Sequence, residues 1–140
     1  ATETVAAAMT AGSHGSTFGG NPLAMAVGNA VLDVVLSDGF LDNVSNVAEY
    51  LSAELGKVVE RNPDVLSEVR GIGLISGVKC QKEGQNGELV KACIGEGLLS
   101  VPAGDNVTRL VPPLIITPEH VDEAMGMLDT ACRAVAGKAG

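Results

Sequence analysis

The segment from Gly12 to Gly20, GSHGSTFGG, holds the side chains best suited to binding an anion. Its glycines let backbone amides approach a ligand closely, and the hydroxyls of Ser13, Ser16 and Thr17 can donate to phosphate oxygens. Asn21-Pro22 follows and predicts the start of a helix, whose amino end would add a favourable dipole. The segment lacks the Lys-Ser/Thr ending of a Walker loop. Two interpretations stay open on these residues alone: a phosphate-binding loop and a structural turn.

Arg109 is the second residue that could do chemistry. It is the one charged residue in the segment VTRLV, which runs into Pro112-Pro113. A guanidinium keeps its charge in proteins, so on a largely apolar strand it needs an anionic partner. That partner could be a carboxylate of the protein, in a structural ion pair. It could also be the carboxylate of a ligand, whose shape suits the guanidinium fork.

The cysteines and histidines lack the spacing of a site. Cys80, Cys93 and Cys132 are far apart, odd in number and set among apolar residues, which favours buried thiols in a reducing compartment over disulfides or a zinc site. His14 and His120 are isolated, and we expect His14 to order its loop and His120 to face solvent. We therefore expect no metal site and a cytoplasmic protein.

The segment VRGIGLISG carries two closely spaced glycines, Gly71 and Gly73. It lacks the third glycine and the following helix of a dinucleotide-binding loop. We interpret it as strand, with glycines that allow close packing. Arg70, in the same segment, is assigned no role.

The composition limits the classes of partner. The chain has 140 residues, of which 46% are hydrophobic, enough for one domain with a core. Its net charge of -8 argues against nucleic acid, because phosphate binding needs clustered Lys and Arg. No segment reaches the roughly 18 apolar residues of a membrane span, and no signal-peptide pattern opens the chain. The opening, ATETVAAA, has neither Met nor a helix cap, so we expect a part of a longer protein.

Hydrophobic spacing predicts an α+β fold, with a long helical entry followed by a small sheet covered by helices. We expect the tail of a helix over 1–9, helices over 22–37, 40–60, 88–94 and 117–136, and strands within 66–80 and at 98–101 and 107–111. Within 66–80, either one strand passes into another or a single strand bends. On the helix over 40–60 we expect a buried face made of Leu41, Val44, Ala48, Leu51, Leu55 and Val58.

Residues 14–24, HGSTFGGNPLA, form a string too long and too unusual for chance, and it resembles a signature of the class-III pyridoxal-phosphate-dependent aminotransferases. The similarity continues through EVRGIGL and LLSVPAGDNVTRLVPPL to the last helix, so it covers essentially the whole chain. The resemblance implies the C-terminal part of a fold-type-I enzyme. Residues 1–38 would form the end of the large domain, the phosphate loop and a connecting helix. Residues 39–140 would form the small domain, with a mainly antiparallel sheet.

The resemblance also implies roles for individual residues. Thr17 would bind the phosphate of pyridoxal phosphate across a homodimer interface, in the site of the partner subunit. Ser16 would contact the substrate. Arg109, in the R-x-x-P-P stretch, would pair with a glutamate of the large domain and release it to bind a substrate carboxylate.

The lysine that holds the cofactor in this family lies upstream of the phosphate loop, so the resemblance places it before Ala1. The five lysines of the chain, none in a similar motif, are Lys57, Lys79, Lys82, Lys91 and Lys138. Because that lysine also moves the proton during amino transfer, we expect the chain alone to be inactive.

The segment VPAGDNVTRLVPPL is similar to the family members that move an amino group from N-acetylornithine to 2-oxoglutarate in arginine biosynthesis. Ornithine, succinyl-ornithine and related amino donors stay open. A second hypothesis is a free-standing, non-catalytic binding or interface module that retains the phosphate loop. The intact mass of the native protein would separate the two, since a module would have the mass of these 140 residues.

Overall fold

The chain forms two compact units, which we describe separately. A computed structural model of the protein describes residues 1–137. Backbone contacts divide the chain after Phe40, whereas the sequence predicted a boundary after residue 38. No single helix in the described residues is long and apolar enough to cross a membrane, although the helices over Pro22–Val35 and Phe40–Arg61 together reach the required length and composition.

The first unit consists of two helices and the loop between them. Helix α1 covers only Glu3–Ala6, shorter than the helix tail expected over residues 1–9, and the side chain of Thr2 makes no capping hydrogen bond there. Helix α2 covers Pro22–Val35 and begins as predicted: Oδ1 of Asn21 accepts a hydrogen bond of 2.9 Å from the amide of Ala24. This cap satisfies one of the amides that every helix leaves free at its start.

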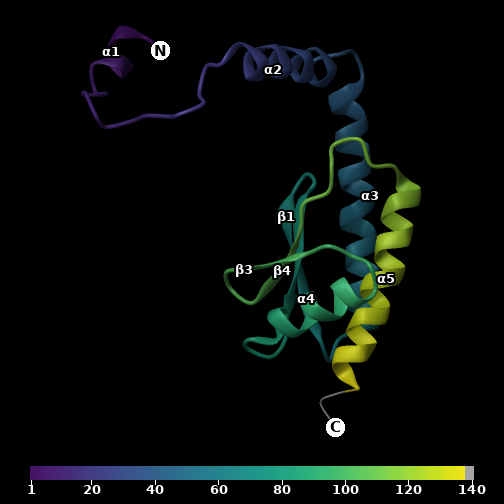
Figure 1. Ribbon diagram of the computed structural model, residues 1–140. Helices are drawn as coiled ribbons and strands as arrows, with labels where there is room; N and C mark the ends of the chain where they lie inside the picture. Colours follow the sequence, from purple (N-terminus) through teal and green to yellow (C-terminus); the bar gives the residue numbers. More distant parts are fainter. Residues whose placement is uncertain (138–140) are drawn as a thin grey trace. The chain divides into compact units, whose positions relative to one another are not determined.

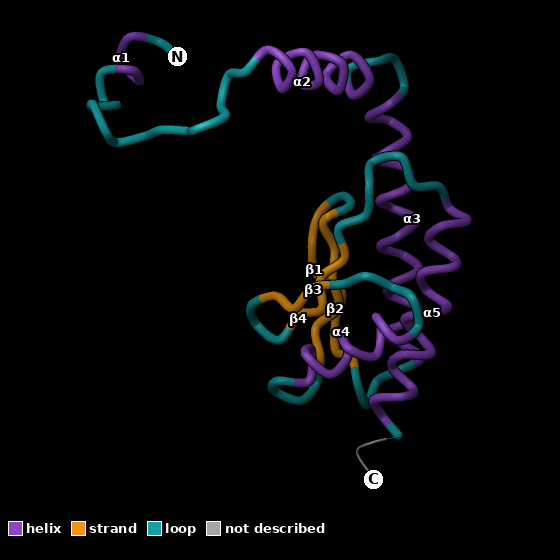
Figure 2. Tube along the Cα trace, in the orientation of Figure 1, coloured by secondary structure: helices purple, strands orange, loops and turns teal. Residues whose placement is uncertain are grey.

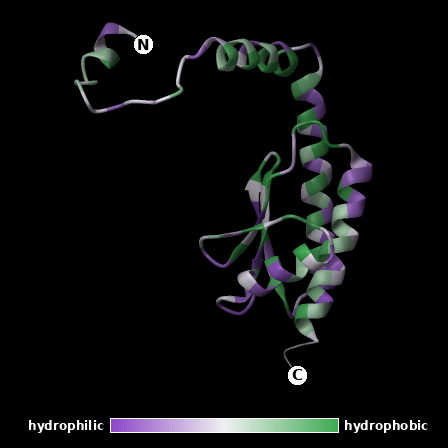
Figure 3. Cartoon of the chain, viewed as in Figure 1, coloured by the Kyte–Doolittle hydropathy of each residue, from purple (hydrophilic) through white to green (hydrophobic). Residues whose placement is uncertain are grey.

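The apolar residues of α2 have no cover within their own unit. Of residues 1–40, all of which the structure describes, none is buried. Figure 3 shows hydrophobic colouring along much of α2, and Leu23 at its start is 75% exposed. Exposed apolar surfaces of this kind mark sites of contact with other protein.

The second unit has its own sheet and its own core (Figures 1 and 2). Its elements are α3 over Phe40–Arg61, β1 over Leu66–Ile72, β2 over Ile75–Cys80, α4 over Gln85–Gly95, β3 over Val101–Ala103, β4 over Val107–Leu110 and α5 over Pro118–Ala136. The four strands form one sheet in the order β1-β2-β4-β3, and every neighbouring pair is antiparallel. The predicted α+β fold with a small antiparallel sheet is confirmed.

The segment over residues 66–80 is a hairpin, so the first of the two predicted arrangements is correct. Ile72 pairs with Ile75, and the two residues between them make the turn. Gly73 has φ +58°, which suits the first position of a tight hairpin turn. At Gly71, a Cβ atom would lie 2.2 Å from the carbonyl oxygen of Ile75, so the two strands meet there without room for a side chain.

Two predicted boundaries in the second unit are wrong. Helix α4 begins at Gln85 rather than Glu88, because Gln85 is buried and its Oε1 accepts a hydrogen bond of 3.3 Å from the amide of Lys82. The strand expected at 98–101 covers Val101–Ala103 instead. Leu98 is still tied to α4, since its amide donates to the carbonyl of Cys93 at 2.9 Å.

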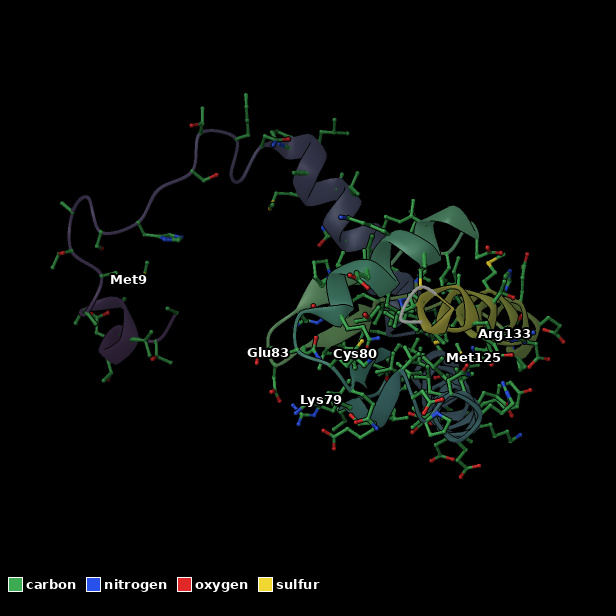
Figure 4. All side chains as sticks on the ribbon, turned by 90° about the horizontal axis from the view of Figure 1, so that it is seen from below. Met9, Lys79, Cys80, Glu83, Met125 and Arg133 are labelled. Atoms are coloured by element: carbon green, nitrogen blue, oxygen red, sulfur yellow. The ribbon has the colours of Figure 1, made fainter. Side chains whose placement is uncertain are left out.

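The helices α3, α4 and α5 cover one face of the sheet only. Val78 of β2 and Thr108 of β4 are paired across the strands and are fully buried beneath the helices. The helices α3 and α5 are joined at the surface by Tyr50, whose hydroxyl donates to Asp122 at 2.6 Å, and this bond raises the pKa of Tyr50 to about 12. In Figure 4, Met125 of α5 lies in the interior, whereas Arg133 lies at the surface.

Helix α3 buries a face that differs at one end from the predicted one. Ala48, Leu51, Leu55 and Val58 are buried as expected, together with Val47. Leu41 was expected on this face but is 52% exposed. It lies in the first turn, before the helix reaches the layer formed by the sheet and α5.

We predict that Leu55→Ala lowers the free energy of unfolding by about 2–5 kcal/mol, because Leu55 is 0% exposed and its truncation leaves a cavity. Leu41→Ala removes the same atoms from the same helix at an exposed position, and should cost less than about 0.5 kcal/mol. Urea denaturation of both variants measures the two values. Equal losses would contradict the placement of Leu41 outside the core.

Candidate functional site

The loop before α2 is fixed at its end by hydrogen bonds within the segment. Oγ of Ser16 accepts a hydrogen bond of 2.9 Å from the amide of Gly19. Nδ2 of Asn21 donates to the carbonyl of Phe18 at 2.6 Å, while its Oδ1 caps the helix. Asn21 therefore joins the loop to the start of α2 with both ends of its side-chain amide.

Thr17 lies in the middle of this loop, and neither its hydroxyl nor its amide is hydrogen-bonded within the described chain. It is exposed, and its hydroxyl makes no hydrogen bond to any residue of 1–137. The amides of residues 14–18 likewise donate no hydrogen bond to any backbone carbonyl of residues 1–137. A hydroxyl and a run of amides next to a helix amino end suit a phosphate group, so these residues fit the phosphate of the cofactor that the resemblance implies.

Arg109 lies on the uncovered face of the sheet in the second unit. Its neighbours Thr108 and Leu110 are buried beneath the helices, while Arg109 itself is exposed. It forms no ion pair with any residue in the described part of the chain. Within residues 1–137, no acidic partner supports a structural ion pair, so the cation is open to an anion from elsewhere.

Arg70 lies near Arg109 on the same face but has partners of its own. Its guanidinium donates to Asp105 and, from Nε at 2.8 Å, to Glu68. Lys79 joins the same cluster, 3.3 Å from Asp105. Arg70 and then Lys79 lower the pKa of Asp105, so this carboxyl stays ionised. Sequence reasoning assigned Arg70 no role, and the structure identifies it as a surface ion pair.

A shallow hollow of about 250 Å³ opens between the two arginines. Gly77 lies at its floor, and its other lining residues include Ile75, Ala103 and Val107. The hollow therefore combines an uncompensated guanidinium with small and apolar walls. That combination can bind the carboxylate of a small acid through a charge-assisted pair.

Asn106 fixes the start of β4, two residues before Thr108, and sequence reasoning missed it. Its Nδ2 donates to the carbonyls of Cys80 and Lys82 at 2.9 and 2.8 Å, and its Oδ1 accepts from the amide of Asn86 at 3.2 Å. Asn106 has φ +58°, in the left-handed region that Asn tolerates better than most residues. The signal in the sequence was the turn pair Asp105-Asn106.

The cysteines and histidines were the other candidates in the sequence. Burial raises the pKa of Cys132 to about 12 and also raises the pKa values of Cys80 and Cys93, so none of these free thiols is a ready nucleophile. In the described residues, no group of His, Cys, Asp and Glu side chains could hold a metal ion. His14 and His120 are exposed, and Nδ1 of His120 accepts a hydrogen bond from the amide of Thr117 at the start of α5.

The lysines in the described residues lie at the surface. Lys57 pairs with Glu54 at 2.5 Å, and Lys79 belongs to the cluster around Asp105. Figure 4 marks Lys79 beside Cys80 at the end of β2. Lys82 and Lys91 are exposed, and Lys138 lies outside the described residues.

Comparison with known proteins decides the family. Residues 1–132 match the family described as aminotransferase class-III. The chain belongs to this family. Both the loop with Ser16 and Thr17 and the strand with Arg109 lie inside the matched range, each in its own unit of the chain.

Individual aminotransferases agree with this assignment. The chain is 55% identical to an acetylornithine aminotransferase of Brucella melitensis over 131 residues, which cover 94% of this chain and 32% of that protein. Among solved structures, an N-acetylornithine aminotransferase from Stenotrophomonas maltophilia matches 85% of this chain and 33% of its own, with TM-score 0.77 and 38% identity. An ornithine aminotransferase from Toxoplasma gondii, whose structure shows partial occupancy of PLP at the active site, matches 92% of this chain and 31% of its own, with TM-score 0.75 and 31% identity.

The chain thus spans about a third of the length of the aminotransferases that it matches, 32% for the protein from Brucella melitensis. Its fold is a fragment of the class-III aminotransferase structure. Ser16, Thr17 and Arg109 are the residues of this fragment whose types and surroundings suit a site.

Proposed function

We propose that this chain is part of a pyridoxal-phosphate-dependent aminotransferase that moves an amino group from N-acetylornithine to 2-oxoglutarate in arginine biosynthesis. The observation that carries the proposal is the 55% identity to an acetylornithine aminotransferase over 94% of the chain, a span that includes both Thr17 and Arg109. The three free cysteines, all buried, support a cytoplasmic enzyme.

In this proposal Thr17 binds the phosphate of the cofactor in the site of the partner subunit of a homodimer. Its exposed hydroxyl and the free amides of residues 14–18 are the donors, and the start of α2 adds its dipole. Pyridoxal phosphate, when bound, supplies the electron sink for amino transfer. The exposed apolar residues of α2 support burial against other parts of the whole enzyme.

Ser16 is proposed to contact the substrate next to Thr17. Its Oγ accepts a hydrogen bond from the amide of Gly19, which leaves its own proton to donate to a ligand oxygen. Arg109 is proposed to bind a substrate carboxylate. It is exposed on a strand held in register on both sides, so the guanidinium is presented by a rigid support.

We predict that Thr17→Ala in the full-length enzyme weakens retention of the cofactor by roughly ten- to a hundredfold, because a hydrogen bond to a charged group contributes about 1.5–3 kcal/mol. The chemical step should change less than the affinity. Titration of the apoenzyme with pyridoxal phosphate measures the affinity, and single-turnover rates at saturation measure the step.

Mixed dimers test whether Thr17 acts across the interface. One subunit carries Thr17→Ala and the other lacks the cofactor lysine. If Thr17 acts in the partner's site, one site of the mixed dimer keeps both the lysine and Thr17, and it should bind the cofactor normally. Weak binding at the site that retains the lysine would show that Thr17 acts within its own subunit.

We predict that Arg109→Lys in the full-length enzyme slows the half-reaction with 2-oxoglutarate by about 30- to 1000-fold, since losing a charge-assisted pair costs roughly 2–4 kcal/mol. Lysine keeps the charge but loses the planar fork that matches a carboxylate. Single-turnover rates of each half-reaction measure the effect. Unchanged rates with only a lower melting temperature would make Arg109 a structural residue.

We predict that the 140-residue chain alone does not transfer amino groups, because none of its five lysines lies in a motif like that of the family's cofactor lysine, which the resemblance places upstream. The test is to mix it with pyridoxal phosphate, reduce with borohydride and map the modified residues. One stoichiometrically modified lysine together with turnover of N-acetylornithine would contradict this prediction. A native protein with an intact mass of 14.2 kDa would instead favour a free-standing module that keeps the phosphate loop.

A further inference from the structure

Gly77 is the residue beside Arg109 on the neighbouring strand. The register places Arg70, Gly77, Arg109 and Val101 in one row across the four strands of the sheet. Side chains of directly paired residues point to the same face of a sheet. Any side chain at position 77 would therefore lie next to Arg109 on the uncovered face.

The glycine at position 77 is required by space and not by backbone conformation. Its φ is outside the left-handed region, so other residues could adopt its backbone. A Cβ atom there would lie 2.6 Å from the carbonyl oxygen of Thr108, 2.7 Å from Cγ1 of Val107 and 3.2 Å from Cα of Arg109. Two of these three atoms belong to the backbone of β4, so the strand that carries Arg109 would have to move.

A side chain at position 77 would also enter the hollow beside Arg109. Gly77 and Arg109 both line that space of about 250 Å³. Arg70, on its other side, is already bound by Glu68 and Asp105. In the described residues, Arg109 is thus the cation of this hollow that has no acidic partner, and Gly77 leaves open the space from which an anion would reach it.

We propose that Gly77 is a positioning residue for the carboxylate-binding arginine: it sets the distance between β2 and β4 and keeps the floor of the hollow empty. The inference rests on the proposed role of Arg109 and adds a residue that acts through the position of that arginine. The effect of a side chain at this position would be steric. A methyl group at position 77 displaces β4 and occupies part of the space next to the guanidinium.

The test uses the full-length enzyme with Gly77→Ala, measured as the concentration dependence of each half-reaction. We expect the dissociation constant for 2-oxoglutarate to rise by about ten- to a hundredfold, the effect of losing one well-placed bond to a charged group. The maximal rate with the amino donor should change by less than about threefold, within the usual context dependence of such effects.

Gly126→Ala is the matched control. Gly126 lies in α5, and a Cβ atom there would meet nothing within 4 Å. This variant should keep both half-reactions and melt slightly higher, because alanine favours a helix over glycine. It separates the effect of position 77 from that of any added methyl group.

A second variant covers the case in which Gly77→Ala folds poorly. Adding Val107→Ala removes the contact with Cγ1 but leaves the methyl group in the hollow and against the backbone of β4. Compared with Val107→Ala alone, this double variant should still bind 2-oxoglutarate weakly. If both Gly77 variants fail to fold, or if both half-reactions fall together, Gly77 serves the fold alone and the proposal is wrong.

Arg109→Lys in the same assay separates two kinds of failure. If Arg109→Lys impairs the half-reaction with 2-oxoglutarate and Gly77→Ala does not, the role of Arg109 stands and that of Gly77 fails. If Arg109→Lys leaves that half-reaction intact, the proposed function of Arg109 fails, and the inference about Gly77 fails with it.

Discussion

The antiparallel pairing of β2 with β4 is the interaction on which the second unit depends. These strands come from residues about thirty positions apart, and each also pairs with a hairpin neighbour, so together they form the centre of the sheet. The pairing turns Val78 and Thr108 toward the helices, where both are fully buried. Because side chains alternate along a strand, the same register turns Gly77 and Arg109 to the opposite face. Burial of the core and exposure of the arginine are thus two results of one register.

Local signals in the sequence predicted what depends on neighbouring residues. Asn21 caps α2 because its short amide reaches the amide of Ala24 three residues ahead, and this pattern is readable from the sequence. The turn at Gly73 is also local, although the sequence left a single bent strand open as the alternative. The family signature over residues 14–24 directed attention to Ser16 and Thr17, since its hydroxyls and glycines are contiguous. Each of these features is determined by interactions among a few neighbouring residues.

Features that depend on distant residues could not be predicted in this way. Glu68, one acidic partner of Arg70, is a close neighbour in sequence, but the other, Asp105, is 35 positions away. The carbonyls bound by Asn106 belong to Cys80 and Lys82. The steric need for Gly77 arises from the backbone of Thr108 on another strand. Leu41 fits the helical spacing of the buried face, yet it is 52% exposed, so periodicity alone misplaced it.

The two regions that suit a site differ in how they are held within the chain. The loop with Thr17 offers free donors on a segment that is exposed throughout, so in the described residues its own unit does not pack against it. Arg109 is presented by a strand paired on both sides and anchored by buried neighbours, so its backbone is fixed before any ligand arrives. The cluster of Arg70, Glu68, Lys79 and Asp105 balances its own charges close by. An anion entering the hollow therefore gains most by pairing with Arg109, because binding Arg70 would require it to displace two carboxylates that are already there.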